Sequence, residues 1–167
     1  MLTQEEANSI FEIKNGKIFY RPRTMTRGRP SVLSGVEAGC DSGHGYRRIS
    51  YKKKKYYAHQ LVFLMVHGYI PALIDHIDGN GCNNDIANLR ECDKAKNNHN
   101  SKMPVSNKSG VKNVFWRNQI NKWQCVLVVN KKRIYCGTFD DLELAELVAY
   151  EAREKYHGKF ANHGVVA

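Results

Sequence analysis

Residues 74–100, which read "IDHIDGNGCNNDIANLRECDKAKNNHN", hold the side chains in this sequence that are best suited to chemistry. Asp75 directly precedes His76, Asn88 follows twelve residues after that histidine, and Asn97 lies further on. A histidine titrates near neutral pH and can take a proton from water. The Asp75 carboxylate and the Asn97 carboxamide offer the oxygen ligands that a hard divalent ion prefers. These residue types together suit the hydrolysis of a phosphodiester, and a site with two protein ligands suits magnesium.

The whole chain is strongly basic, which indicates a polyanionic partner. Its 167 residues include 26 Lys and Arg against 16 Asp and Glu, giving a formal net charge of +10. Basic side chains that neutralise phosphates release condensed counterions, so this charge favours nucleic-acid binding. A basic protein that is merely soluble would carry the same charge, and composition leaves that alternative open. The length allows one ordinary domain or two small ones.

Cysteine usage and hydropathy predict a reducing compartment and no membrane. The five cysteines form no Cys-x-x-Cys pair and are odd in number, which argues against a zinc ribbon or a secreted disulfide framework. No N-terminal run has the form of a signal peptide, and no apolar stretch approaches the roughly 18 residues of a membrane span. We therefore expect a soluble, cytoplasmic protein with no membrane partner.

Local signals predict strands and turns in the first part of the chain. Residues 11–22 should form a hairpin around Asn15-Gly16, the strongest two-residue turn signal. Residues 24–45 are rich in Gly, Ser and Arg, and they indicate a loop whose arginines could lie along a phosphate backbone. Residues 46–60 should form a second hairpin, with its turn at positions 52–55.

The candidate residues fall on elements that follow these hairpins. Residues 58–67 are apolar and are followed by stop signals, which predicts a short buried helix. Two short strands are expected at residues 73–77 and 86–91, joined by turn-forming residues. Asp93 should then cap a helix over about 94–101. Because neighbouring residues on a strand point to opposite faces, Asp75 and His76 could serve different sides of a scissile phosphate.

The last third of the chain predicts a second small unit after a polar linker at residues 101–110. Three strands are expected at residues 111–118, 122–130 and 132–139, followed by a helix over 142–158. The chain is therefore expected to be α+β, with β-hairpins and a strand-strand-helix motif in the first part. A small three-stranded antiparallel sheet packed on one helix should follow.

Alternation along these strands assigns each face of the expected sheet. One face should pack on the helix, whose cap is Asp140 or Asp141. The strand residues expected on that face are Trp123, Cys125, Leu127, Val129, Ile134 and Cys136. The helix residues expected to meet them are Leu142, Ala145, Val148, Ala149, Ala152 and Tyr156.

Residues 73–100 resemble the His-Asn-His (HNH) nuclease motif, in the subgroup found in phage and intron homing endonucleases. The shared features are the Asp-His pair, the tripeptide "NLR" and an Asn-rich helix. The upstream segment "YRRISYKKKKYYAHQLVFLMVHGYIP" matches the hairpin and the His-x-Leu-Val helix that precede the motif in that subgroup. The resemblance implies a ββα-metal fold that holds one metal ion. It also implies a nuclease domain over residues 1–103, with its core at about 58–103.

This resemblance gives each residue of the motif a role. His76 would be the general base, and Asp75 would be a metal ligand. Asn88 would tie the loop so that His76 is oriented. Asn97 would be the second metal ligand. Many relatives have a histidine at the position of Asn97, which makes His99 a rival ligand.

Two further residues of the matched region have alternative roles. His59 would brace the fold or contact a DNA phosphate. Arg90 would contact phosphate or form a structural salt bridge. We include both residues among the candidates for DNA binding.

Residues 109–164, after a linker at 104–108, resemble the plant APETALA/ethylene-response DNA-binding domain. The shared features are Trp116, the "KW" and "GTFDD" sequences, and an Ala-rich helix ending in "HGKFAN". The resemblance implies a sheet that enters the major groove. Because Val126 and Val128 replace charged residues of that family, we expect contact with thymine methyl groups or readout of DNA shape. The residues expected to face DNA are Lys112, Trp116, Arg117, Arg133 and Tyr135.

Together these features predict a metal-dependent endonuclease of phage or mobile-element type that acts on double-stranded DNA in the bacterial host. The expected ion is Mg²⁺, with Mn²⁺ or another divalent metal as an alternative, and no organic cofactor is expected. One such site per chain and no evident dimer seam predict a monomer that nicks one strand. The resemblance implies 5′-phosphate and 3′-hydroxyl ends. The alternative is a DNA-binding protein that retains the HNH motif as a scaffold without catalysis.

Overall fold

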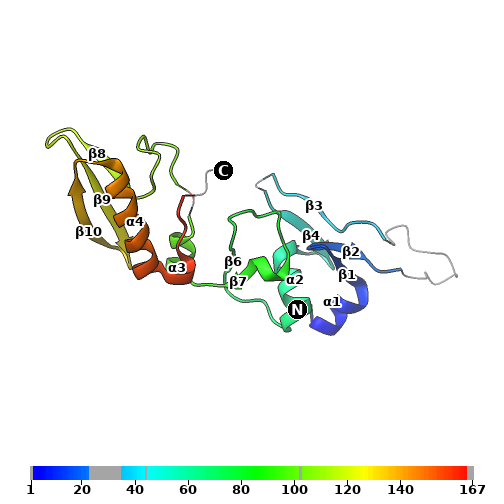
Figure 1. The fold of residues 1–167 in the computed structure, drawn as a ribbon. Helices are drawn as coiled ribbons and strands as arrows, with labels where there is room; N and C mark the ends of the chain where they lie inside the picture. The colour runs from blue at the N-terminus through cyan, green and yellow to red at the C-terminus, as the bar shows by residue number, and fades with distance from the viewer. Residues whose placement is uncertain (1, 23–34, 44, 102, 165–167) are drawn as a thin grey trace, which may run out of the picture. The chain divides into compact units, whose positions relative to one another are not determined.

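The computed structural model describes residues 2–22, 35–43, 45–101 and 103–164, and Figure 1 shows their helices and strands. The chain divides into two compact units, Met1–Cys92 and Asp93–Ala167. Both units combine helices with small antiparallel sheets, which confirms the α+β class. The arginines that we expected along a phosphate backbone fall within residues 23–34, outside the described residues.

The first unit combines two helices with short antiparallel strands. Its elements are, in chain order, α1 (Gln4–Ile10), β1 (Phe11–Lys14), β2 (Lys17–Tyr20), β3 (Cys40–Asp41), β4 (Arg47–Tyr51), β5 (Lys54–Tyr57), α2 (Ala58–His67), β6 (Ile74–His76), the 3₁₀ turn η1 (Ile86–Asn88) and β7 (Leu89–Glu91). Across the described residues these strands pair as β1-β2, β3-β4-β5 and β6-β7. The β6-β7 pair carries the Asp-His sequence.

Both predicted hairpins and the predicted helix of this unit are present. The turn between β1 and β2 has positive φ angles at Asn15 and Gly16, of 51° and 70°, as a tight Asn-Gly turn requires. The second hairpin turns at Lys52 and Lys53 alone, so its turn is shorter than predicted. α2 has the predicted bounds and ends at Gly68, whose φ of 86° lies in the left-handed region.

Three local features of the first unit differ from the sequence prediction. α1 was not predicted, although Thr3 caps it by accepting a hydrogen bond from the Glu6 amide. β3 lies in a stretch that was expected to be a loop, because it pairs with β4. The first half of the expected strand 86–91 is instead the turn η1, because the Asp85 side chain accepts from the Ala87 amide and favours a helical turn there.

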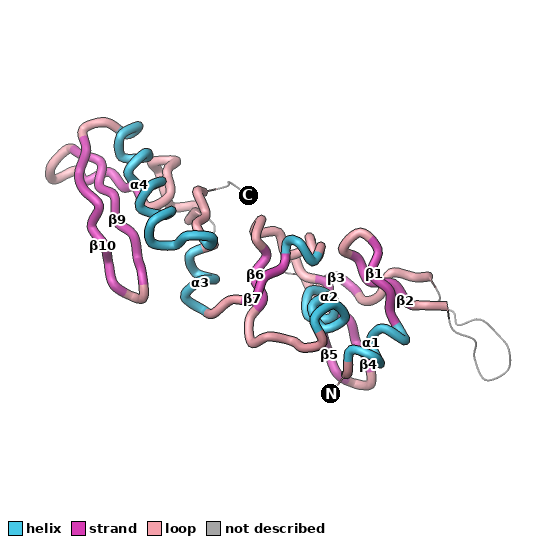
Figure 2. The backbone as a smooth tube through the Cα atoms, turned by 60° about the horizontal axis from the view of Figure 1, so that its bottom comes forward, coloured by secondary structure: helices cyan, strands magenta, loops and turns pink. Residues whose placement is uncertain are grey.

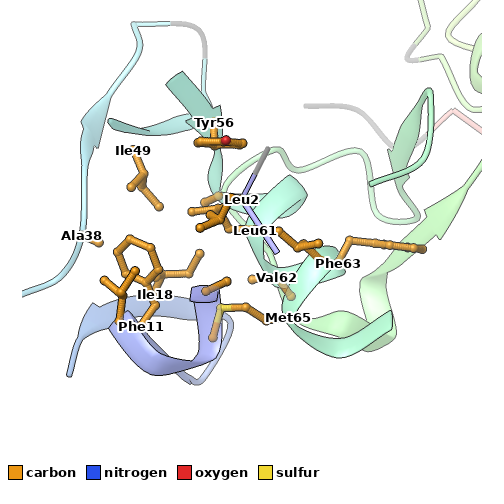
Figure 3. Packing of buried hydrophobic residues seen from close by; sticks show 14 of the residues in the cluster. Leu2, Phe11, Ile18, Ala38, Ile49, Tyr56, Leu61, Val62, Phe63 and Met65 are labelled. Carbon is orange, nitrogen blue, oxygen red and sulfur yellow. The ribbon is translucent and has the colours of Figure 1, made fainter. Parts of the chain in front are cut away.

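The core of the first unit lies where α1 and α2 meet the β1-β2 and β4-β5 hairpins (Figure 3). Leu89 of β7 belongs to the same core, so the strand pair of the candidate site is fixed to it. Each large apolar side chain buried in this way contributes about 1.5–3 kcal/mol. The side chains with no more than 1% exposure include those of Phe11, Ile18, Ile49, Leu61 and Val62.

The second unit is a sheet covered by one long helix, with a short helix at its start (Figure 2). Its elements are α3 (Lys94–His99), β8 (Val114–Arg117), β9 (Lys122–Val129), β10 (Lys132–Phe139), α4 (Leu142–His157) and the 3₁₀ turn η2 (Gly158–Phe160). The strands pair antiparallel in the order β10-β9-β8, as predicted. Asp93 caps α3 as expected, and of the two candidates for α4 the cap is Asp141.

The core of the second unit lies between α4 and one face of the sheet. Cys125 and Leu127 are fully buried there, with Trp123, Ile134 and Cys136 packed beside them, as alternation predicted. Three alanines of α4, at positions 145, 149 and 152, seat the helix closely on the sheet. We had also assigned Val129, Val148 and Tyr156 to this core. That assignment was wrong, because the helix contacts the sheet mainly through its alanines and these three side chains lie outside the core.

Candidate functional site

His76 is buried and its ring is held by an amide from the adjoining loop. Its Nε2 lies 3.1 Å from Oδ1 of Asn84, and both side chains are buried. The Asn84 Nδ2 donates in turn to the carbonyl of Cys82. Since Oδ1 of Asn84 can only accept, Nε2 of His76 is the donor in this contact, which fixes the orientation of the imidazole ring. We had interpreted Asn84 only as a turn residue.

Aromatic side chains surround His76. The ring of His59 meets it edge-on with centroids 5.2 Å apart, and the ring of Tyr46 lies 5.8 Å away. Tyr57 stacks on His59 at an interplanar angle of 9°. Burial, with a smaller effect from His76, lowers the pKa of His59 to about 4, so His59 is neutral at physiological pH. His59 thus packs between Tyr57 and His76.

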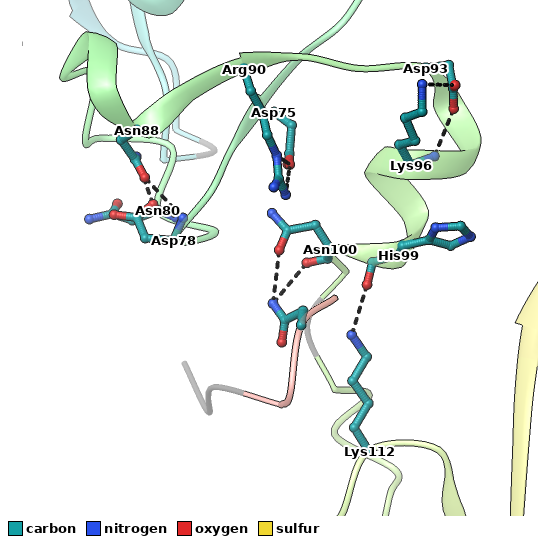
Figure 4. Close-up of polar contacts among 11 residues, drawn as sticks. Asp75, Asp78, Asn80, Asn88, Arg90, Asp93, Lys96, His99, Asn100 and Lys112 are labelled. Carbon is teal, nitrogen blue, oxygen red and sulfur yellow. Dashed lines mark hydrogen bonds and ion pairs between the residues drawn. The ribbon is translucent and has the colours of Figure 1, made fainter. Parts of the chain in front are cut away.

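The loop after β6 is tied by reciprocal bonds between Asn88 and Asp78 (Figure 4). The Asp78 amide donates to Oδ1 of Asn88 at 3.1 Å, and Nδ2 of Asn88 donates to the Asp78 carboxylate at 2.9 Å. That Nδ2 also donates to the carbonyl of Asn83. Burial raises the pKa of Asp78, but hydrogen bonds from Asn83, Asn80 and Asn88 outweigh it and leave the pKa below its ordinary value. The Asp78 carboxylate was not among the predicted residues.

Asp75 is buried on β6 and forms an ion pair with Arg90 of β7 (Figure 4). The Arg90 Nη2 and Nε lie 2.6 Å and 2.7 Å from Oδ2 of Asp75. The two residues are direct partners in the strand register, so they lie on the same face of the hairpin. Of the two roles considered for Arg90, the structure shows the salt bridge.

Asn97 and its rival His99 both lie on α3, which belongs to the second unit. Asn97 is exposed, whereas His99 stacks on His157 with ring centroids 3.9 Å apart and an interplanar angle of 7°. In the part of the chain that the structure describes, no three or more His, Cys, Asp or Glu side chains converge on a metal position. Asp75 and Asn97 carry oxygen donors of the type that a hard divalent ion prefers, and they belong to different units of the chain.

The face of the β8-β9-β10 sheet opposite its buried core carries basic and aromatic side chains. Strand register places Arg133 opposite Val128, and Tyr135 opposite Val126, on this outer face. Phe115 and Arg117 join them from β8. Tyr135, Phe115 and Val128 are about half exposed. This surface, made of Phe115, Arg117, Val126, Val128, Arg133 and Tyr135, is called the outer sheet face below.

Two residues predicted to face DNA do not belong to the outer sheet face. Lys112 is only 6% exposed, because its Nζ turns inward to the carbonyls of His99 and Ser101. Trp116 is the direct cross-strand partner of Trp123, with ring centroids 4.9 Å apart, and therefore lies on the side of the sheet that α4 covers. The outward aromatic of β8 is Phe115. The pairing of positions 116 and 123 could have revealed this, because cross-strand partners share a face.

Part of the chain matches a known protein family. These residues match the family described as HNH endonuclease, which covers the chain from β5 to the end of α3. The chain therefore carries an HNH endonuclease domain, whose substrate class is nucleic acid.

The wider chain has a relative in a bacteriophage. It is 37% identical over 120 residues to Protein 3.8 of Escherichia phage T7, an alignment that covers 68% of this chain and 97% of that protein. The chain belongs to the same family as Protein 3.8 of phage T7. No solved structure matches it. Among the described residues, no helix has the length and apolar character needed to cross a membrane.

Proposed function

We propose that this protein is a divalent-metal-dependent endonuclease of phage or mobile-element type that nicks one strand of double-stranded DNA. The observation that carries the proposal is the geometry at His76 within the HNH match. A buried imidazole has one nitrogen engaged by Asn84, and the carboxylate of Asp75 precedes it in the chain. A scaffold has no need for an imidazole and a carboxylate at successive positions of one strand, whereas hydrolysis can use both.

In this proposal each residue of the motif has one task. His76 takes the proton of the attacking water, and Asn88 and Asn84 keep the loop and the imidazole in place. Asp75 and Asn97 would hold the metal ion through oxygen atoms. The ion, Mg²⁺ in the first instance, supplies positive charge that stabilises the phosphate and the leaving oxygen. The products are 5′-phosphate and 3′-hydroxyl ends, as in HNH nucleases.

The second unit adds DNA binding through its outer sheet face. Arg117 and Arg133 carry positive charge there, and Phe115 and Tyr135 supply aromatic surface beside two valines. Such a surface suits phosphate contacts combined with apolar contact to bases or readout of DNA shape. We propose an APETALA-like domain over residues 109–164 and a nuclease domain over 1–103. Because one motif is present per chain, we propose a monomer that cuts one strand at a time.

The ion pair between Asp75 and Arg90 favours a second candidate function. An arginine on the Asp75 carboxylate competes with a cation for the same oxygen. In that case the chain would bind DNA through both units without cutting it. The two candidates differ in whether a divalent ion displaces Arg90 from Asp75 when DNA is bound.

Incubation with supercoiled plasmid carrying phage DNA separates these functions. With Mg²⁺ we expect conversion to open circle, with linear DNA appearing only late, and no conversion in EDTA. Mapping of the ends should give 5′-phosphate and 3′-hydroxyl. Binding without any metal-dependent ends, for Mg²⁺ and Mn²⁺ alike, would establish the non-catalytic function. Immediate linearisation by a dimer would contradict the single-site nickase.

A further inference from the structure

The C-terminal end of α3 is held by residues from the body of the second unit (Figure 4). The Lys112 Nζ donates to the carbonyl of His99 at 3.2 Å and to the carbonyl of Ser101. The Lys112 carbonyl accepts in turn from Nη1 of Arg153 on α4, at 2.6 Å. α3 is thus connected to the main helix of the sheet through one buried lysine.

A second connection reaches α3 from the C-terminal segment. The Asn162 Nδ2 donates to the carbonyl and to Oδ1 of Asn100, at 3.0 Å and 3.3 Å, and both residues are buried. His99 adds its stack on His157 at the end of α4. A six-residue helix is unstable by itself, so these contacts rather than local propensity hold α3 in place.

Lys112 is buried, although burial of its ammonium group is unfavourable. Desolvation, with a smaller effect from the positive charge of Arg153, lowers the pKa of Lys112 to about 8. Burying an ammonium group is costly unless hydrogen bonds compensate for the missing water. Here the compensating hydrogen bonds go to the carbonyls of His99 and Ser101, which follow the proposed metal ligand Asn97 in the chain.

We infer that Lys112 and Asn162 are positioning residues for the nuclease site, which fix α3 and thereby the carboxamide of Asn97. The inference rests on the proposed function, in which Asn97 is a metal ligand. Along the chain, only Cys92 and Asp93 separate the end of β7 from the start of α3. The second unit then serves the nuclease site as well as DNA binding.

The test compares metal binding by the full chain and its variants. Lys112→Met removes the ammonium group, and Asn162→Ala removes a neutral partner of Asn100 without changing the charge. The matched controls are Lys132→Met and Asn118→Ala, at exposed positions of the same unit. Mn²⁺ affinity is measured by water-proton relaxation, and the Mg²⁺ concentration for half-maximal cleavage by plasmid nicking. DNA affinity is measured in EDTA, and folding by circular dichroism.

We expect Lys112→Met and Asn162→Ala each to weaken Mn²⁺ binding and to raise the Mg²⁺ concentration for half-maximal cleavage, both by about 10-fold. Losing a residue that orients a metal ligand usually weakens metal binding by at least this factor. DNA affinity in EDTA should match that of the respective control. When Asn97→Ala is already present, neither change should weaken Mn²⁺ binding further, because both act through Asn97. This non-additivity distinguishes positioning from a general loss of stability.

Several outcomes would overturn the inference. Mn²⁺ affinity equal to that of the controls would do so, as would effects that add to that of Asn97→Ala. If Lys112→Met fails to fold, Asn162→Ala decides alone. A parent chain that binds no Mn²⁺ overturns the inference together with the metal site. A parent that binds Mn²⁺ but cuts no DNA refutes the proposed activity, while the Mn²⁺ affinities still decide the role of Lys112.

Discussion

The contact between His76 and Asn84 orients the imidazole that we propose as the general base. We expect His76→Ala to lower the nicking rate about 10²-fold or more, the usual contribution of a general base. DNA affinity in EDTA should change little, because the residue acts on water. His67→Ala, which removes an exposed histidine from the end of α2, is the control for removal of an imidazole. Activity of His76→Ala within a few-fold of the parent would move the role to another residue, with His99 the first to test.

His59 makes stability depend on pH because its pKa differs between the folded and unfolded states. It falls from 6.5 to about 4 on folding, chiefly through burial. Below pH 6.5, His59 binds a proton in the unfolded chain but not in the folded chain. The free energy of unfolding is therefore highest above pH 6.5, and this contribution to it is lost as the pH falls towards 4. Thermal unfolding should show a smaller loss over this range for His59→Gln than for the parent. Equal losses in the two proteins would contradict this origin.

At the residue scale, the sequence indicated candidate side chains but did not predict what they contact. Asp75, His76 and Asn88 became candidates because residue type and spacing are visible in the chain. Asn84 was missed because its partner is decided by how the loop closes, which no local signal reports. Lys112 was assigned to DNA because a lysine is usually exposed, whereas two carbonyls of a distant segment bury it.

At the scale of elements, the β1-β2 hairpin supports the loop of the candidate site. A side chain at Gly16 would place its Cβ 2.7 Å from the amide nitrogen of Asp85 and 3.1 Å from the carbonyl carbon of Asn84. The tip of the hairpin therefore touches the backbone next to the residue that holds His76. Only glycine allows both this approach and the positive φ of the turn.

We expect Gly16→Ala to reduce nicking more than its cost in stability would suggest. The added Cβ displaces the loop and with it Asn84, so the imidazole of His76 is no longer held in its productive position. Misplacement of a catalytic group lowers activity by about 10-fold or more. Gly43→Ala is the matched control, since Gly43 also has a positive φ, of 80°, but has open space at the Cβ position. Comparable activity losses in the two variants, at comparable melting temperatures, would show that backbone strain alone is responsible.

Elements with strong local signals were predicted almost to the residue, and those that depend on partners were not. The Asn-Gly turn, the apolar run of α2 and the cap at Asp93 are encoded locally. α1 lacks the length for a clear periodic signal and depends on its contact with α2. β3 exists only because it pairs with β4. Strand alternation correctly predicted that Trp123, Cys125 and Leu127 of β9 pack in the core. It placed Trp116 wrongly, because register was not applied across the pair.

At the scale of the whole molecule, the net charge of +10 implies that binding depends strongly on salt. Replacing Arg117 and Arg133 together should weaken DNA binding and reduce the slope of log affinity against log salt by about 0.9 for each phosphate that is no longer neutralised. The Mg²⁺ requirement should stay at the parental value, because neither residue touches α3. The control for the loss of two positive charges is replacement of Lys131 and Lys155, two exposed lysines of this unit. An unchanged slope would exclude the outer sheet face as a DNA-binding surface.

The anchoring of α3 also decides where this protein can be recombined with its relatives. The linker at 104–108 suggests a natural joint, but a chimaera joined there would separate α3 from its own Lys112 and Asn162. A junction between Cys92 and Asp93 keeps α3 with the body that holds it. Exchange of target preference among such nucleases should therefore succeed when the donor supplies α3 together with its sheet. The exchangeable segment would then begin inside the HNH motif.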